Sequence, residues 1–199
     1  MLSHSAKAFR RLVFASTLAA GLAFGGAAHA DTYVFDKGHT EIRFSWSHFG
    51  ISRMSGMMLD FDGALNFDAA APENSTLRFT GKTNSFWTRV KELDDHLQGA
   101  DYFDSAKYPE ITFTTTKLEK TGDKTGKITG DLTIKGVTKP VILQAEMKFQ
   151  GLHPYFKKPT LGFEAKTTIK RSEFKVESGI PFVSDEIEIT INTEMNQQG

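Results

Sequence analysis

Four histidines follow residue 30, and these are the first side chains to consider for chemistry: His39, His48, His96 and His153. None forms a recognised metal-binding motif with a second ligand-type residue two or four positions away. His48 has the strand phase of Phe44 and Trp46, so we expect it to face the interior of the fold or its rim. A hydrogen-bonded structural histidine is the ordinary role for such a position. The sequence therefore predicts no metal site.

A second group of reactive side chains lies in one short predicted helix. Glu92, Asp94 and Asp95 cluster there with His96, which resembles a general acid–base set. No serine, cysteine or threonine nucleophile motif accompanies them, and adjacent acids are usually a solvated helix face. We therefore expect Asp94 or His96 to hold the helix against a strand rather than to perform catalysis.

Two further segments have the composition of a ligand site but not its spacing. Met54, Met57 and Met58 suggest copper(I), yet Met57 and Met58 point to opposite faces of a strand. The segment Gly122–Ile128 resembles a phosphate-binding loop, but three residues instead of four separate its glycines, and Ile128 replaces the required Ser or Thr. The first group is better explained by packing, and the second by a charged hairpin turn.

The elements that carry these residues are predicted to be strands, because apolar and polar residues alternate along most of the chain. One change of phase between Met58 and Phe61 predicts a bulge or bend near Leu59–Asp60. Turn signals lie at 68–74, 121–126 and 135–136, and the only helix expected after residue 30 spans Thr88–Leu97, with Thr88 as its cap. The predicted strands are Thr40–His48, two segments between Gly56 and Phe67, Leu77–Thr83, Glu110–Leu118, Lys127–Ile134, Val141–Phe149, Thr160–Lys170 and Glu186–Thr193. This order predicts an all-β fold, an antiparallel barrel of about eight strands with one short helix.

The first 30 residues read as a cleaved signal peptide. Lys7, Arg10 and Arg11 precede an apolar run, and Ala28-His29-Ala30 is a small-x-small cleavage site. We expect cleavage after Ala30, one domain over 31–199, and no stable membrane insertion, because no second hydrophobic segment follows.

The composition after residue 30 excludes several classes of protein. This part has 21 Lys and Arg against 24 Asp and Glu, a net charge of −3, which disfavours nucleic acid and anionic membranes as partners. The chain has no cysteine, so it has neither disulfides nor thiolate metal sites. Fourteen of its 17 Phe lie after residue 30. Such a content of aromatic residues fits both a well-packed core and a lipid-lined cavity.

Several loosely defined motifs occur in a specific order over some 150 residues of this part. They are Asp36 with His39–Phe44, His48-Phe49-Gly50, the Gly56–Asp68 alternation, Asp94-x-His96-Leu97, Asp101–Asp104 with Tyr108-Pro109, Gly130–Val141, Gly162–Phe174 and Val183-Ser184-Asp185. Together they resemble the YceI-like family, small exported bacterial proteins with a lipocalin-like barrel. Three residues depart from the family pattern: Met58 and Leu93 replace a usual Phe and Arg, and Lys175 replaces a common Gly.

The resemblance implies that the chain binds a polyisoprenoid or similar long-chain lipid, such as an isoprenoid quinone, in the periplasm. It implies no other cofactor and no enzyme activity, and homodimers are plausible for the family. Strand phase and aromatic size suggest which side chains contact the lipid. These are Phe44, Trp46, Phe61, Phe79, Phe113 and Phe163 on strands, and Phe86, Trp87, Leu97 and Phe103 near the helix as a lid.

Two alternatives remain open from the sequence. The chain is an enzyme acting on isoprenoid lipids if His48 and a carboxylate form a polar pair inside the barrel. It is an interaction or stress protein without a cavity if the same aromatic residues form a plain core.

Overall fold

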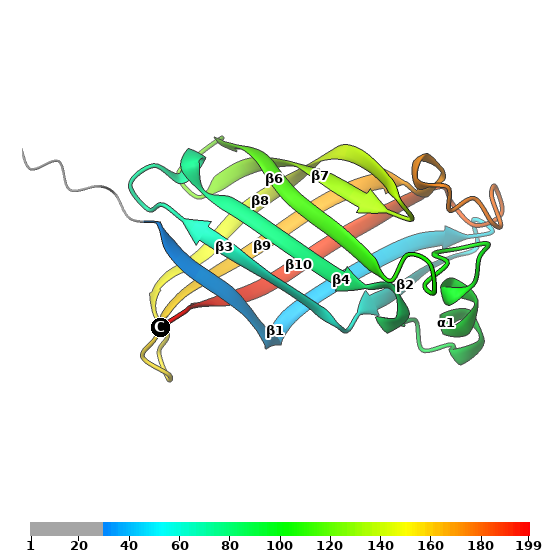
Figure 1. Cartoon of the computed structure of the whole chain (residues 1–199), viewed down its shortest axis with the longest axis horizontal. Helices are drawn as coiled ribbons and strands as arrows, with labels where there is room; N and C mark the ends of the chain where they lie inside the picture. The colour runs from blue at the N-terminus through cyan, green and yellow to red at the C-terminus, as the bar shows by residue number, and fades with distance from the viewer. Residues whose placement is uncertain (1–29) are drawn as a thin grey trace, which may run out of the picture.

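The computed structural model describes residues 30–199, and this part of the chain folds into one antiparallel sheet (Figure 1). The predicted signal peptide lies outside the described residues except for Ala30. In the part of the chain described, no helix is long and apolar enough to cross a membrane. The elements are β1 (Asp31–His48), β2 (Ser52–Met58), β3 (Phe61–Phe67), η1 (Pro72–Asn74), β4 (Thr76–Lys82), η2 (Thr83–Ser85), β5 (Phe86–Trp87), α1 (Lys91–Gln98), β6 (Glu110–Lys120), β7 (Thr125–Ile134), β8 (Val137–Leu152), β9 (Pro159–Lys170), η3 (Arg171–Phe174) and β10 (Glu186–Gln197).

The sheet closes on itself because β10 pairs with β9 on one side and with β1 on the other. β2 and β3 pair with successive parts of β1, so they occupy one position in the wall, and the two-residue β5 only extends the edge of β2. Eight strand positions therefore surround the interior, which confirms the predicted barrel. Closure pairs the edges that an open sheet would leave at β1 and β10.

The long strand β1 pairs with β3 in its first part and with β2 in its last part, and it bends sharply between them, at the bottom of Figure 1. Its pairing register with β10 shifts between Phe35 and Thr40. A second interruption falls at Leu59–Asp60, between β2 and β3, where the change of phase predicted a bend. Irregularities of this kind increase strand twist and allow a sheet to close.

The β7–β8 hairpin has a two-residue connection and lies at the predicted turn. Only Lys135 and Gly136 connect the two strands, and both have positive φ angles, 49° and 72°. This is the geometry of a two-residue type I′ loop, whose twist matches that of the strands. A side chain is also excluded at Gly136 because its Cβ would approach the ring of Tyr108 to 2.8 Å.

The predicted helix is present, but its start was predicted wrongly. α1 begins at Lys91 rather than Thr88, after Arg89 reverses the chain with a φ of 69°. Thr88 is buried and does not cap the helix; its backbone N–H and its hydroxyl both donate to Asp94 Oδ1, at 2.7 and 2.6 Å. Asp94 thus ties α1 to the segment after β5, as predicted, while His96 is exposed.

Candidate functional site

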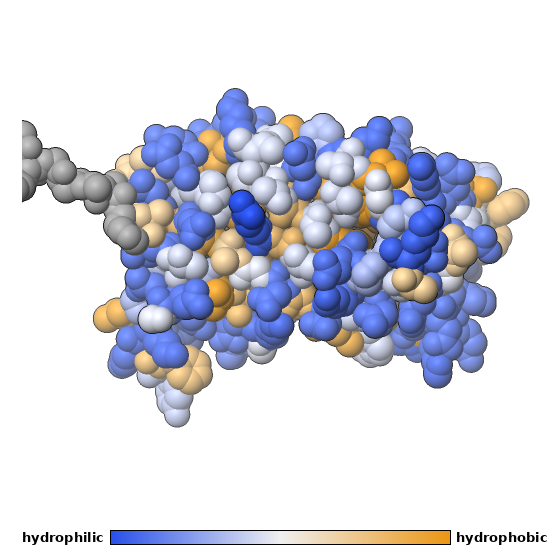
Figure 2. Space-filling view, in the orientation of Figure 1, coloured by the Kyte–Doolittle hydropathy of each residue, from blue (hydrophilic) through white to orange (hydrophobic). Residues whose placement is uncertain are grey.

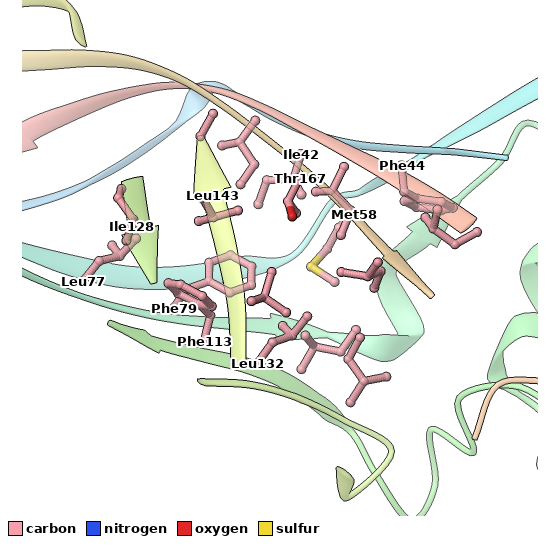
Figure 3. A pocket seen from close by; sticks show the side chains of 18 of the residues that line it. Ile42, Phe44, Met58, Leu77, Phe79, Phe113, Ile128, Leu132, Leu143 and Thr167 are labelled. Atoms are coloured by element: carbon pink, nitrogen blue, oxygen red, sulfur yellow. The ribbon is translucent and has the colours of Figure 1, made fainter. Parts of the chain in front are cut away.

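The barrel encloses a cavity of about 470 Å³ whose lining comes from the strands of the wall and from α1. On β1, the alternation places Ile42, Phe44, Trp46 and His48 in the lining, as the sequence predicted. In Figure 3 the labelled side chains project from the surrounding strands into one common space, and most of their atoms are carbon. The outer face drawn in Figure 2 is largely hydrophilic, with apolar residues visible mainly in its central part. On this face the molecule presents mainly polar groups to solvent, while the residues that line its interior are mostly apolar.

Most of the side chains predicted to contact a ligand lie in this lining. They are Phe44, Trp46, Phe79, Phe86, Leu97, Phe103, Phe113 and Phe163. Their contact with a ligand stays a prediction, but the structure brings all eight to one cavity.

Phe61 and Trp87 were predicted to belong to the same set, and the structure places both elsewhere. Phe61 is only 3% exposed, and its ring packs against the lining residues Phe35 and Phe79, with centroids 5.7 and 6.2 Å away. It therefore faces the interior but is covered by the lining residues around it. Trp87 is 44% exposed, because its neighbour Phe86 points into the barrel and successive strand residues face opposite sides.

One end of the cavity is covered by α1 and an aromatic cluster beneath it. Phe44 stacks on Trp46 at 5.7 Å and meets Phe86 edge-on at 5.2 Å, and Phe86 lies 4.6 Å from Phe103. Leu93 and Leu97 of α1 complete the lining here. Leu93, where the family pattern has Arg, therefore adds apolar surface at this end.

The opposite end of the cavity is also apolar. Leu65, Phe67 and Met195 line it there and pack with Tyr33 and Leu161 in a separate buried cluster. The lining also includes Ser75, next to η1, and Leu118 near the far end of β6. The cavity thus runs along the barrel from α1 toward the end that holds η1.

Arg171 is the one charged side chain in the lining, counting residues 30–199, and the sequence analysis assigned it no role beyond its place in the Gly162–Phe174 motif. It is buried, and its guanidinium donates to four backbone carbonyls: Ser184 and Val183 at 3.0 Å, Val176 at 2.9 Å and Ser178 at 2.7 Å. Burial lowers the pKa of Arg171, while the nearby Asp185 acts in the opposite direction. The charge thus holds the segment between η3 and β10 in place.

No aspartate or glutamate is among the cavity-lining residues of the described chain. His48 does line the cavity, but the carboxylate partner that an acid–base pair requires is missing from that lining. The remaining polar lining groups are neutral: the hydroxyls of Ser75, Tyr102, Thr115, Thr167 and Thr193. This arrangement offers an apolar surface for binding and few groups for proton transfer.

Many aliphatic lining residues of β7 to β10 were also missed, although the sequence contained their signal. Ile187, Ile189 and Ile191 of β10 all line the cavity, and their alternation with glutamate and threonine was the cleanest in the chain. Selecting candidates by aromatic size excluded them.

These features define a class of protein, a closed eight-stranded β-barrel with an elongated apolar cavity. The family model described as "YceI-like domain" matches residues 33–195. The chain is 39% identical over 193 residues to Protein YceI of Escherichia coli O157:H7, which covers 96% of this chain and 98% of that protein. The chain therefore belongs to the YceI-like family.

Solved structures agree with this assignment. The crystal structure of the Campylobacter jejuni YCEI protein is 36% identical, with a TM-score of 0.70 over 77% of this chain and 90% of that one. A polyisoprenoid binding domain from Saccharophagus degradans has a TM-score of 0.64 over 85% of this chain and 99% of that one. Its identity is 14%, so this second likeness concerns the fold alone.

Proposed function

We propose that this protein binds a polyisoprenoid or similar long-chain lipid, such as an isoprenoid quinone, inside its barrel, as a carrier or buffer in the periplasm. The observation that carries the proposal is the apolar cavity running from α1 to the opposite end of the barrel. The similar fold of a protein described as a polyisoprenoid binding domain supports the same ligand class.

The energetics favour a hydrocarbon chain over a polar ligand. Each methylene group that moves from water into an apolar cavity contributes about 0.8 kcal/mol. Ordering a long flexible chain and losing its free motion offset part of this gain. An extended chain also matches a lining that runs from Leu93 of α1 to Leu118 of β6, whereas a compact ligand would leave much of it uncovered.

Binding is favoured over catalysis by the same lining. Transformation of an isoprenoid would require a general acid or base next to the reacting carbon, and the carboxylates of the described chain lie outside the lining. His48 is the residue to test: if the protein is a carrier, His48→Ala leaves lipid composition in the bound fraction unchanged. A substrate that accumulates unconverted in His48→Ala would establish the enzyme alternative.

The cellular location and the partners stay predictions from the sequence. The signal peptide over 1–30 predicts export, and the net charge of −3 for the remainder disfavours nucleic acid as a partner. The homodimer expected from the family resemblance also stays a prediction.

The proposal is tested by mass spectrometry of lipids that co-purify with the protein from a bacterial periplasm. We expect one polyprenyl or quinone species in a near-stoichiometric amount. Phe163→Arg, which puts a charge in the cavity, should lose the lipid while remaining folded by circular dichroism, because an unpaired buried charge is costly. Thr168→Arg, on the exposed face of the same strand, is the control and should retain it. A folded wild-type protein without lipid would support the interaction-protein alternative instead.

A further inference from the structure

Three side chains with metal-ligand chemistry meet on the outer wall, where β1 and β10 close the barrel. Asp36 and His39 lie in the irregular part of β1, and Glu194 lies on β10. One ligand atom of each lies within 4.8 Å of those of the other two. The neighbours of Glu194 in sequence, Thr193 and Met195, line the cavity, so Glu194 faces outward. The cluster is therefore separate from the lipid cavity.

The bend in β1 fixes the first two groups. His39 Nδ1 lies 3.0 Å from Asp36 Oδ2. The Asp36 carboxylate also accepts the backbone N–H of Gly38 on Oδ1, at 3.0 Å, and the side-chain amide of Asn196 on Oδ2, at 3.2 Å. These hydrogen bonds fix the orientation of the Asp36 side chain. Outer hydrogen bonds of this kind orient the ligands of many metal sites.

Glu194 supplies the independent observation that a ligand is missing. Its Oε2 is buried from solvent and has no hydrogen-bond partner among residues 30–199, although the side chain as a whole is 38% exposed. His153 Nε2 lies 3.6 Å away, beyond hydrogen-bonding distance. At this distance the imidazole compensates poorly for burying the carboxylate oxygen, and a cation at this point would be a closer partner.

His153 lies beside this group but is not a ligand itself. Its Nδ1 accepts the backbone N–H groups of Tyr155 and Phe156, both at 3.1 Å. Nδ1 therefore carries no proton, and the proton of the neutral imidazole is on Nε2, which faces Glu194. A protonated nitrogen cannot coordinate a metal ion, so three protein ligands remain.

We propose that His39, Asp36 and Glu194 bind one first-row divalent transition metal ion such as Zn²⁺, with solvent completing its coordination. One imidazole nitrogen with two carboxylate oxygens suits such ions, whereas Ca²⁺ and Mg²⁺ prefer all-oxygen sites. Zinc bonds of about 2.0–2.2 Å place tetrahedral ligands roughly 3.3 Å apart. His39 Nδ1 and Asp36 Oδ2 lie 3.0 Å apart, close to this value, and the proton that they share would leave when the ion binds. Glu194 places a carboxylate oxygen within 4.8 Å of a ligand atom of each.

An ion at this position would bridge β1 and β10 at the seam of the barrel. Because it binds the folded chain and not the dispersed ligands of the unfolded one, it should raise the melting temperature as its concentration increases. This effect does not depend on the lipid, so the metal proposal and the lipid proposal can fail separately.

The test is isothermal titration of the untagged protein with ZnCl₂ in a non-chelating buffer, with thermal melts in parallel. We expect one ion per chain, a rise in melting temperature, and no comparable effect of MgCl₂. His39→Gln and Glu194→Gln should each weaken zinc binding by at least about tenfold and abolish the thermal shift. His96→Gln, the same change on exposed helix α1, should behave as the wild type.

Three results would overturn the proposal. The first is a wild type without saturable zinc binding. The second is zinc binding that survives unchanged in both His39→Gln and Glu194→Gln. The third is zinc binding that is lost in His96→Gln, which would place the ion on α1. Because the two ligand variants alter different strands, a folding defect in one leaves the other informative.

Discussion

Ala165→Leu distinguishes a ligand cavity from a closely packed core, because the two cases predict opposite signs for its effect on stability. Ala165 is 8% exposed and lines the cavity opposite Ala145 of the neighbouring strand, so two of the smallest lining residues lie side by side. The added three carbons enter the space assigned to the lipid. Filling an empty cavity stabilises the unliganded protein by about 0.5–2 kcal/mol, whereas overpacking a full core costs about 1–3 kcal/mol.

The same substitution should weaken lipid binding by a calculable amount. Three carbons displace about three methylene groups of the ligand, each contributing about 0.8 kcal/mol, so binding loses about 2.4 kcal/mol. This corresponds to a dissociation constant about 50-fold larger. Thr168→Leu adds apolar surface on the exposed face of β9 and should change neither the cavity nor the affinity.

Intrinsic fluorescence provides the assay, because the chain has two tryptophans and only Trp46 lines the cavity. In a Trp87→Phe background, geranylgeraniol titrated into delipidated protein should change Trp46 emission, and urea unfolding gives the stability. Reduced stability of Ala165→Leu with unchanged affinity would refute the reasoning, since it would mean that the space around Ala165 is already filled by protein.

Three other predictions concern the segment that follows β9. Arg171→Met should cost at least about 3 kcal/mol in urea unfolding, because it leaves one buried and three partly buried carbonyls without their donor. Arg171→Lys should not restore the loss, because an ammonium has only three donors. Burial would raise the pKa of Asp185, but hydrogen bonds from Ser172 and the charge of Arg171 lower it. The ionised carboxylate therefore stabilises the folded state above about pH 4, and this contribution is lost as pH falls through the lower folded-state pKa. Asp185→Asn should remove that part of the pH dependence and flatten the acid limb of a stability–pH curve. Lys175 has a φ of 60°, at a position where the family commonly has glycine. Lys175→Gly should raise the free energy of unfolding by about 0.5–1 kcal/mol. An unchanged free energy of unfolding would show that the left-handed backbone costs lysine nothing there.

The sequence was most informative where one periodicity decides both the element and its orientation. On β1, alternation alone placed Phe44, Trp46 and His48 in the lining, and the change of phase before Phe61 located the break between β2 and β3. A strand with one polar and one apolar face can pack in a closed barrel in only one orientation, with the apolar face inward.

Long-range arrangement explains what could not be predicted. The ring of Phe61 is covered by Phe35, whose position depends on the shift in register of β1 against β10. The outer cluster unites His39 with Glu194, which is far away in sequence, so no local spacing reveals it. The start of α1 depends on a reversal at Arg89 and a hydrogen bond from Thr88 to Asp94 that replaces the expected cap.

The most direct test of the central claim is a crystal structure of the protein purified from a bacterial periplasm and, in parallel, loaded with geranylgeraniol. The account predicts continuous, elongated electron density inside the barrel, beginning beside Leu93 of α1 and extending along the lining strands toward Leu118. A barrel that holds only ordered water in both preparations, or lipid bound solely on the outer surface, would contradict it.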